Sequence, residues 1–260
     1  MAGQHEALTD WIEEKWNGDA VIPEVLEHAP DLSVLDAYHT QAARMARHVA
    51  KGDRIIGYKA ALTSKAMQRQ VGIDEPILGT LLGSRTFSED SSLSLGAFMV
   101  PTLEPEVAVV LKDDLTGPGV TPLDAMAAVQ GYLPAVEIGD IRTGDNVRSL
   151  QQTILCNTFN GGHIFGAPLA APGGIDLRRE GMALYVNGEV AGTATAAEVL
   201  GDPINSVVFM ANKLGEIGQG LKAGMVLMTG SIVASIKLKA GDEVFAAFTR
   251  LGEVRVRCVA

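Results

Sequence analysis

The sequence predicts an α+β protein with a mixed, rolled β-sheet preceded by a helical segment. Three observations predict this class. Apolar residues recur at helical spacing within the first 50 residues. From about residue 98 onward, short apolar runs bounded by turn residues indicate mostly strands. Helical patterns interrupt those strands only occasionally, without the strict strand–helix alternation that a parallel α/β sheet requires.

The N-terminal helical prediction depends on one clear periodic pattern that ends at Lys51-Gly52. Its apolar positions are Val34, Leu35, Tyr38, Ala42, Met45, Ala46 and Val49. Residues 53–90 mix a short strand over 54–58 with a polar loop-and-helix stretch. We therefore predict a helical or cap region over residues 1–90 and a metal-binding, catalytic β-roll over residues 91–260.

The strands that we predict in the second region are 99–112, 133–139, 182–191, 224–235 and 243–259, the last broken by a turn at 251–253. The pair Asn187-Gly188 lies between apolar flanks and indicates a β-hairpin. One helix is expected over 123–130. A second begins with Asp202 as N-cap and Pro203 at its first position, and runs to about Gly215.

Composition limits the class of protein. The chain has 260 residues, 47% of them hydrophobic, and a formal net charge of −10. An acidic chain without a basic stripe argues against a nucleic-acid partner. No run of 18 apolar residues and no apolar leader are visible, so we expect no membrane partner and a cytoplasmic location. Two cysteines, Cys156 and Cys258, suggest no disulfide framework.

The segment 101–110 carries the first candidate metal ligands. On a strand, side chains two positions apart share a face, so Glu104 and Glu106 are expected to point the same way. Their apolar flanks indicate burial, and two buried carboxylates repel unless a cation lies between them. The alternative is a solvated pair on an edge strand, which Pro105 between them would suit.

A third carboxylate, Glu137, lies within the apolar strand 133–139, where an unpaired charge is costly. It is either a further ligand or the partner of a base such as Arg142. Three hard oxygen donors would suit Mg²⁺ or Mn²⁺ better than zinc.

Several motifs occur in order at compatible spacing over about residues 30–260. They are Gly57-Tyr-Lys-Ala-Ala-Leu-Thr-Ser-Lys-Ala-Met-Gln68, Ile73-Asp-Glu-Pro-Ile-Leu-Gly79, Pro101 to Glu106, Pro134 to Arg142, Met228-Thr-Gly-Ser231, Lys222-Ala-Gly224 and Lys239-Ala-Gly-Asp242. This ordered set resembles the 2-keto-4-pentenoate hydratase / 4-oxalocrotonate decarboxylase family of the fumarylacetoacetate hydrolase-like superfamily. The resemblance implies a mixed β-sandwich roll, homo-oligomeric assembly, and a Mg²⁺ or Mn²⁺ held by Glu104, Glu106 and Glu137.

The resemblance also implies a substrate and its contacts. The substrate would be a small 2-oxo or 2-hydroxy carboxylate from aromatic catabolism. Lys59 matches the family's active-site lysine, and beside a cation its pKa is expected to be lowered. Substrate-binding positions that carry over are Thr229, Gly230, Ser231 and Asn157. The alternative for Lys59 is a surface lysine at the end of a strand. The alternative for the turn that contains Thr229, Gly230 and Ser231 is a plain connection between strands.

Two departures from the family pattern bear on the reaction. Ile77 stands where hydratases of the family usually carry an acidic residue, and Cys156 and Phe159 replace an aspartate and a serine; we expect both of these replacements to make the pocket less polar. We expect Cys156 to be a buried small hydrophobe rather than a nucleophile.

The leading hypothesis is a metal-dependent hydratase of a 2-hydroxyalka-2,4-dienoate. The alternatives are decarboxylation of a 2-oxo-3-enedioate, C–C hydrolysis of an acylpyruvate using His48 or His163, and a non-catalytic partner subunit.

Overall fold

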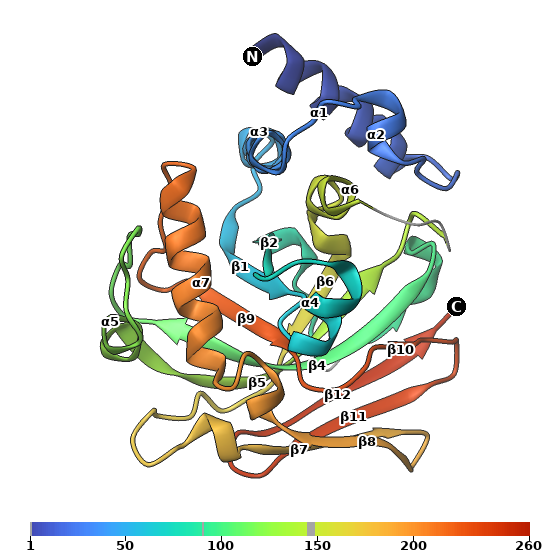
Figure 1. Ribbon diagram of the computed structural model, residues 1–260. Coiled ribbons are helices and arrows are strands. Elements are labelled where there is room, and N and C mark those ends of the chain that lie inside the picture. Colours follow the sequence, from blue (N-terminus) through green and yellow to red (C-terminus); the bar gives the residue numbers. More distant parts are fainter. Residues whose placement is uncertain (1, 90, 145–148) are drawn as a thin grey trace.

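A computed structural model describes residues 2–89, 91–144 and 149–260 (Figure 1). It shows an α+β protein with two mixed sheets and an N-terminal helical segment, which confirms the predicted fold class. No helix in these ranges is long and apolar enough to cross a membrane.

The N-terminal region is helical, as predicted. It contains α1 (Ala2–Asn17), α2 (Val25–His28) and α3 (Val34–Ala50). Ser33 caps α3 by accepting a hydrogen bond from the backbone N–H of Asp36, and the helix buries one face that includes Tyr38 and Met45. In Figure 1 these helices lie at the opposite end of the molecule from the five-stranded sheet.

Among the described residues, seven strands form the first sheet: β1 (Ile55–Ala61), β2 (Ile77–Leu82), β4 (Pro101–Leu111), β5 (Val129–Asp140), β6 (Asn160–Phe165), β9 (Val226–Ser231) and β10 (Ile236–Lys237). The order is β2-β1-β9-β4-β5-β6, and β10 pairs with β4. The backbone N–H of Phe87, just beyond β2, donates to the carbonyl of His163 on β6 at 2.9 Å. The two ends of the sheet therefore meet, and the sheet rolls into a barrel-like form.

The second sheet contains five strands in the part of the chain that is described: β3 (Ser92–Ser94), β7 (Gly181–Val186), β8 (Glu189–Thr195), β11 (Glu243–Phe248) and β12 (Gly252–Val259). Its strands β11 and β12 pack against β5 of the first sheet (Figure 1). The hairpin predicted at Asn187-Gly188 is confirmed: it joins β7 to β8, and both residues have positive φ, 54° and 85°.

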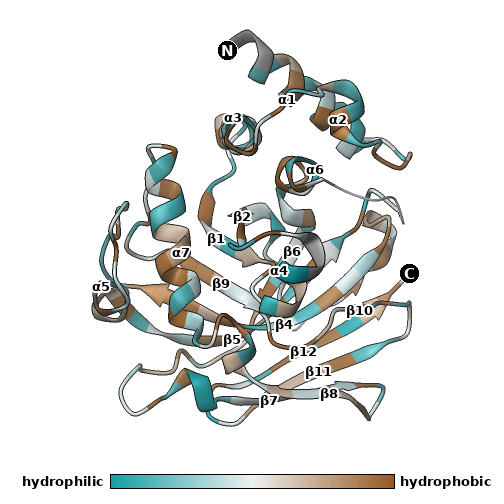
Figure 2. Ribbon diagram, in the orientation of Figure 1, coloured by the Kyte–Doolittle hydropathy of each residue, from teal (hydrophilic) through white to brown (hydrophobic). Residues whose placement is uncertain are grey.

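Four further helices cover the first sheet: α4 (Lys65–Val71), α5 (Pro122–Ala128), α6 (Leu150–Leu155) and α7 (Pro203–Glu216). Short 3₁₀ turns span Gly83–Arg85, Leu95–Ala97, Asn157–Phe159, Leu177–Arg179 and Ala196–Glu198. Asp202 caps α7 as predicted, accepting from the backbone N–H of Ile204. Figure 2 shows hydrophobic and hydrophilic residues alternating along α7, because one side of the helix packs on the sheet.

Some elements differ from the prediction. The strand expected over 54–58 continues to Ala61, and β2, α6 and β6 were not predicted. The β2 sequence is buried on both faces, so it shows no alternation of apolar and polar residues. Strands from both sides of residue 90 share the first sheet. The division of the chain at residue 90 stays a prediction.

Candidate metal centre and active site

Two neighbouring strands bring three carboxylates together. Glu104 on β4 lies directly opposite Glu137 on β5, and Glu106 follows on the same face of β4. One oxygen from each carboxylate lies within 4.8 Å of the other two. The strand β4 is interior, paired with β5 on one side and with β9 and β10 on the other. The solvated edge pair considered for Glu104 and Glu106 is therefore wrong.

Pro105 is tolerated in this interior strand because its neighbours change there. β10 pairs at Leu103, whereas β9 pairs from Glu106 onward with a bulge. Proline has no N–H to donate, and its carbonyl still accepts from the backbone N–H of Ile232 at 3.0 Å. The break in pairing thus allows proline between the two glutamates.

The carboxylates are buried with too few donors. Glu106 is 1% exposed and Glu137 is 2% exposed, whereas Glu104 is partly exposed. Oε2 of Glu106 accepts from the backbone N–H of Gly230 at 2.7 Å, but its Oε1 has no hydrogen-bond partner among the described residues. Burial and the charge of Glu137 raise the pKa of Glu104 to about 7 and that of Glu106 well above its usual value.

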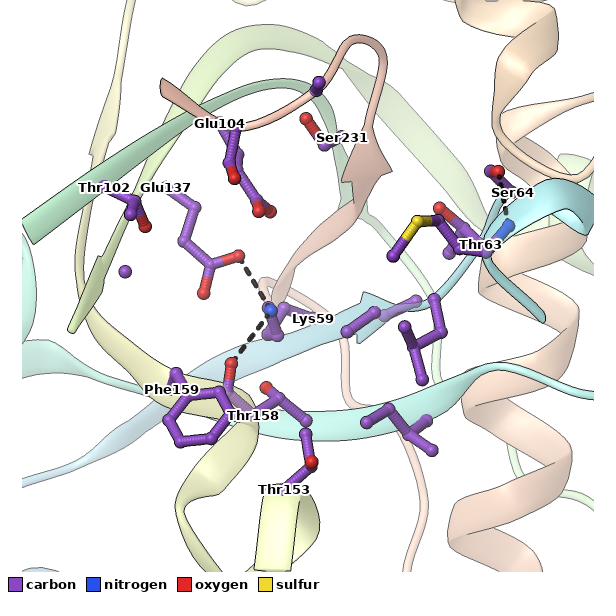
Figure 3. A pocket seen from close by; sticks show the side chains of 18 of the residues that line it. Lys59, Thr63, Ser64, Thr102, Glu104, Glu137, Thr153, Thr158, Phe159 and Ser231 are labelled. Carbon is purple, nitrogen blue, oxygen red and sulfur yellow. Dashed lines mark hydrogen bonds and ion pairs between the residues drawn. The ribbon is translucent and has the colours of Figure 1, made fainter. Parts of the chain in front are cut away.

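Lys59 supplies one positive charge to the cluster. Its Nζ lies 2.8 Å from Oε2 of Glu137 and donates to the carbonyl of Thr158 at 3.4 Å (Figure 3). Burial alone would lower the pKa of Lys59, but attraction to Glu137 and the other two carboxylates raises it. A lowered pKa was expected for Lys59 beside a metal ion. Next to the three carboxylates alone, the pKa of Lys59 is instead raised.

Glu137 was expected to be either a ligand or the partner of a base such as Arg142. It does pair with a base, Lys59, but Arg142 as that base is wrong. Nε of Arg142 lies 2.6 Å from Oδ2 of Asp140, and its Nη1 donates to the carbonyl of Trp16. The side chain of Asp140 also accepts from the backbone N–H of Met99. Arg142 thus links β5 to the N-terminal helices and does not reach the cluster.

A strained turn supports Lys59 and Glu137. Asn157, Thr158 and Phe159 all have φ between 51° and 60°, a conformation that costs non-glycine residues roughly 1–2 kcal/mol each. The turn presents the carbonyl of Thr158 to Lys59. The next residue, Asn160, donates from Nδ2 to Oε1 of Glu137 at 2.9 Å. Sequence reasoning missed Asn160, because Asn160-Gly161 has the pattern of an ordinary turn.

Gly79 allows this turn to approach β1. A Cβ at Gly79 would overlap the hydroxyl of Thr158 and lie 3.0 Å from Cδ of Lys59. The residue pairs with Lys59 in the β1–β2 ladder. Glycine is therefore required where Lys59 passes between the strand and the turn.

The cluster opens onto a large cavity of about 1220 Å³. Its lining includes Lys59, Glu104, Glu137, Ser231, Thr102 and Thr158, and the apolar side chains Leu62, Met67, Ile77, Ile141, Leu150, Phe159, Ile232 and Val233. Glu106 is not among the residues that line the cavity. The cavity thus combines a charged wall with mainly apolar surroundings, the usual character of a small-molecule site.

The predicted substrate-binding residues are only partly brought to this cavity. Ser231 lines it, with its hydroxyl donating to the carbonyl of Val233. The hydroxyl of Thr229 is fully buried and donates to the carbonyl of Val107, and Gly230 contributes its N–H to Glu106. These contacts give Thr229 a structural role and Gly230 a role in holding a candidate ligand.

Within residues 155–159, some side chains also line the large cavity and others do not. The side-chain amide of Asn157 pairs with the backbone N–H and carbonyl of Thr80, at 2.7 and 2.8 Å. Phe159 lines the large cavity and makes it less polar, as expected, and the apolar side chain of Ile77 lines the cavity as well. Cys156 is buried in the hydrophobic core, which confirms the buried small hydrophobe. It does not line the large cavity, so its expected effect on pocket polarity is wrong.

The donor set fits a divalent cation. All three side chains offer hard carboxylate oxygens, and Oε1 of Glu106 is buried without a donor. Three clustered carboxylates, two of them buried, share one lysine, so a cation would balance the remaining charge. Oxygen ligands of this kind suit Mg²⁺ or Mn²⁺.

Neither histidine considered for hydrolysis reaches the cavity. His163 is fully buried, its Nε2 is hydrogen-bonded to Oγ1 of Thr86 at 2.9 Å, and burial lowers its pKa to about 4. His48 lies on α3, where it borders a separate small cavity. The large cavity is lined by neither residue.

Comparison with known proteins agrees with this geometry. The fumarylacetoacetate (FAA) hydrolase C-terminal family model matches residues 59–259, which include the three glutamates and Lys59. The chain belongs to the fumarylacetoacetate hydrolase family. The 2-hydroxyhexa-2,4-dienoate hydratase of Comamonas testosteroni is 35% identical over 83% of this chain and 83% of the relative.

Two decarboxylases are also similar. The 4-oxalocrotonate decarboxylase of Pseudomonas putida is 34% identical over 97% of this chain and 96% of that protein. The structure of 4-oxalocrotonate decarboxylase from Pseudomonas putida G7, complexed with magnesium and adipate, superposes with a TM-score of 0.96 at 32% identity, covering 100% of this chain and 98% of that one. The relatives place this family member in the hydratase and decarboxylase group predicted from its motifs.

Proposed function

We propose that this family member is a divalent-metal-dependent lyase that hydrates a 2-hydroxyalka-2,4-dienoate, the enol form of a 2-oxo-4-enoate. The observation that carries the proposal is the convergence of Glu104, Glu106 and Glu137 beside Lys59 at the wall of a large, mainly apolar cavity. The names of relatives such as 2-hydroxyhexa-2,4-dienoate hydratase support the substrate class. We further propose Mg²⁺ or Mn²⁺ as the metal, a homo-oligomer, and a cytoplasmic location.

Each residue of the site has a separate role in the proposed reaction. Glu104, Glu106 and Glu137 would hold the cation, which when bound supplies a Lewis acid for the 2-oxy oxygen and carboxylate of the substrate. Lys59 holds a proton at Nζ on the cavity wall and delivers it to C5 of the dienol, while the 2-hydroxyl gives up its proton, which returns to Nζ; the hydroxyl of the added water then joins C4 and its proton joins C3. The hydroxyl of Ser231 borders the cavity and would bind the substrate carboxylate by turning its O–H away from the carbonyl of Val233.

The apolar wall orients the rest of the substrate. Ile77 and Phe159 line the cavity with Lys59, so they hold the unsaturated chain against the proton donor.

Decarboxylation of a 2-oxo-3-enedioate is the second candidate. The observation that favours it is the apolar pair Ile77 and Phe159, because an apolar wall raises the free energy of a carboxylate placed against it and favours its loss as CO₂. The similarity to 4-oxalocrotonate decarboxylase supports the same reaction. Acylpyruvate hydrolysis has no comparable support, since neither His48 nor His163 lines the cavity.

The test is turnover with product identification. Purified protein is incubated with Mg²⁺, and separately with EDTA, and offered 2-hydroxypenta-2,4-dienoate or 2-oxohex-3-enedioate. Hydration gives a 4-hydroxy-2-oxo acid by NMR, whereas decarboxylation releases CO₂. Glu106→Gln should abolish most activity, and Glu198→Gln, an exposed carboxylate that borders the same cavity, should not.

Turnover that is equal in EDTA would contradict the metal site. Absence of turnover with both substrate classes would instead favour the non-catalytic partner subunit.

A further inference from the structure

A second, small cavity lies behind the strained turn. It has a volume of about 40 Å³ and is bordered by Glu13, Trp16, Arg44, His48, Arg85 and Asn160, among others. The turn separates it from the large cavity: Thr158 and Phe159 face the large cavity, whereas Asn157 and Asn160 border the small one. Anything bound in the small cavity therefore contacts the support of Lys59 and Glu137.

Arg44 is buried beside this cavity with few partners. Its side chain is 4% exposed, its Nη1 donates to the carbonyl of Leu155 at a long 3.3 Å, and its guanidinium lies 4.8 Å from the ring centre of Trp16. Its Nε has no hydrogen-bond partner, and no described carboxylate lies within ion-pair distance of Arg44. Burial lowers the pKa of Arg44 only to about 10, so it stays charged at neutral pH. An unpaired buried charge costs several kcal/mol.

The charged groups around the cavity leave an excess of positive charge. Arg85 stands exposed at its rim, and the half-buried His48 has a pKa lowered by burial and by Arg44. Glu13 is the carboxylate that borders the cavity among the described residues, and it lies 3.5 Å from Nη1 of Arg47. Two arginines, Arg44 and Arg85, thus border the cavity together with one carboxylate, Glu13.

The two asparagines do not offset this excess. The amide of Asn157 is used by the backbone of Thr80, and Nδ2 of Asn160 is used by Glu137. Arg44 and Arg85 supply the arginine donors at this cavity.

We propose that the cavity formed by Arg44, Arg85 and the 157–160 turn binds a small monovalent anion of the chloride class. The volume is roughly three times the minimum that a single water molecule needs, which suits one small ion and excludes a large organic anion. The anion would pair with the guanidinium of Arg44 and brace the turn whose carbonyl contacts Lys59. It would be a structural anion, separate from the proposed metal and substrate.

The experiment measures thermal stability of the full chain against sodium chloride, compared with sodium gluconate at equal ionic strength, because gluconate is too large for the cavity. Chloride should raise the melting temperature and saturate. Crystals soaked in sodium bromide should show an anomalous peak beside Arg44.

Variants locate the site. Arg85→Gln, at the exposed rim, should raise the half-saturating chloride concentration by about tenfold for a lost charge-assisted contact. The matched control is Arg179→Gln, which removes the same charge from a side chain that is 85% exposed in another part of the fold, and should leave the response unchanged. Arg44→Met should remove the chloride response if it folds. Equal melting in chloride and gluconate, a wild-type response in Arg85→Gln, or bromide absent from the cavity would each overturn the proposal.

Discussion

Replacing one proposed metal ligand should stabilise the metal-free protein while removing its metal. Glu104 lies within 4.8 Å of two other carboxylates, and its pKa is raised from 4.5 to about 7 by burial first and by Glu137 second. Ionised Glu104 is therefore unfavourable in the folded protein without a cation. Glu104→Gln keeps the shape of the side chain and removes this charge.

The direction in which pH changes the stability of the metal-free protein follows from proton binding by Glu104. The pKa of Glu104 is higher in the folded chain than in the unfolded chain, so the folded state binds more protons between pH 4.5 and 7. Ionisation then costs folding stability as the pH rises through this range. A pKa raised from 4.5 to about 7 corresponds to roughly 3 kcal/mol. Because the side chain is partly exposed, solvent screening reduces this, and we expect about 2 kcal/mol at pH 8.

The assay is urea denaturation of EDTA-treated protein at pH 5 to 8, with Mg²⁺ titrated by calorimetry. Metal-free Glu104→Gln should exceed the wild type in free energy of unfolding at pH 8, and the difference should shrink toward pH 5. Mg²⁺ should bind the wild type and bind the variant much more weakly. Glu198→Gln, exposed on the same cavity, should change neither quantity. A variant that is less stable than the wild type at pH 8, or that binds Mg²⁺ normally, would refute the reasoning.

Three further predictions concern mechanism, packing and assembly. Lys59→Ala should lower kcat by roughly 10²–10⁴-fold with little change in metal affinity, as expected for loss of a general acid–base. Lys59→Arg should have an equally low kcat. Rescue of kcat by arginine would show that Lys59 only supplies a positive charge. Gly79→Ala should lower kcat, because its methyl overlaps Thr158 and crowds Lys59; unchanged kinetics in a folded variant would contradict this positioning. Sedimentation at micromolar concentration should give a homo-oligomer, and a clean monomer would exclude it.

Local patterns gave much of the architecture and part of the site. The two-residue period of a strand places Glu104 and Glu106 on one face, and Asp202-Pro203 and Asn187-Gly188 mark a helix start and a hairpin that the structure confirms. The buried strands β2 and β6 were missed, because burial on both faces removes the alternation that identifies a strand. The short helix α6 was missed as well.

The contacts of single residues could not be predicted from motifs. Thr229 and Asn157 lie in segments that resemble substrate-binding motifs, yet their side chains bond to Val107 and Thr80 of neighbouring strands. Asn160 had no signal at all, although it holds Glu137. A motif gives the residue type at a position, but the direction of its side chain depends on which strand lies beside it.

The sequence by itself determined the fold class and the family, and it selected the three glutamates and Lys59 as candidate site residues, because strand periodicity and motif order are properties of the chain alone. The tertiary structure alone decided that Glu137 faces Glu104 and that Lys59, rather than Arg142, is its ionic partner. The register between β4 and β5 and the closure of the rolled sheet are set by packing between segments far apart in sequence. Those long-range contacts create the buried environment in which the carboxylates repel and their pKa values rise.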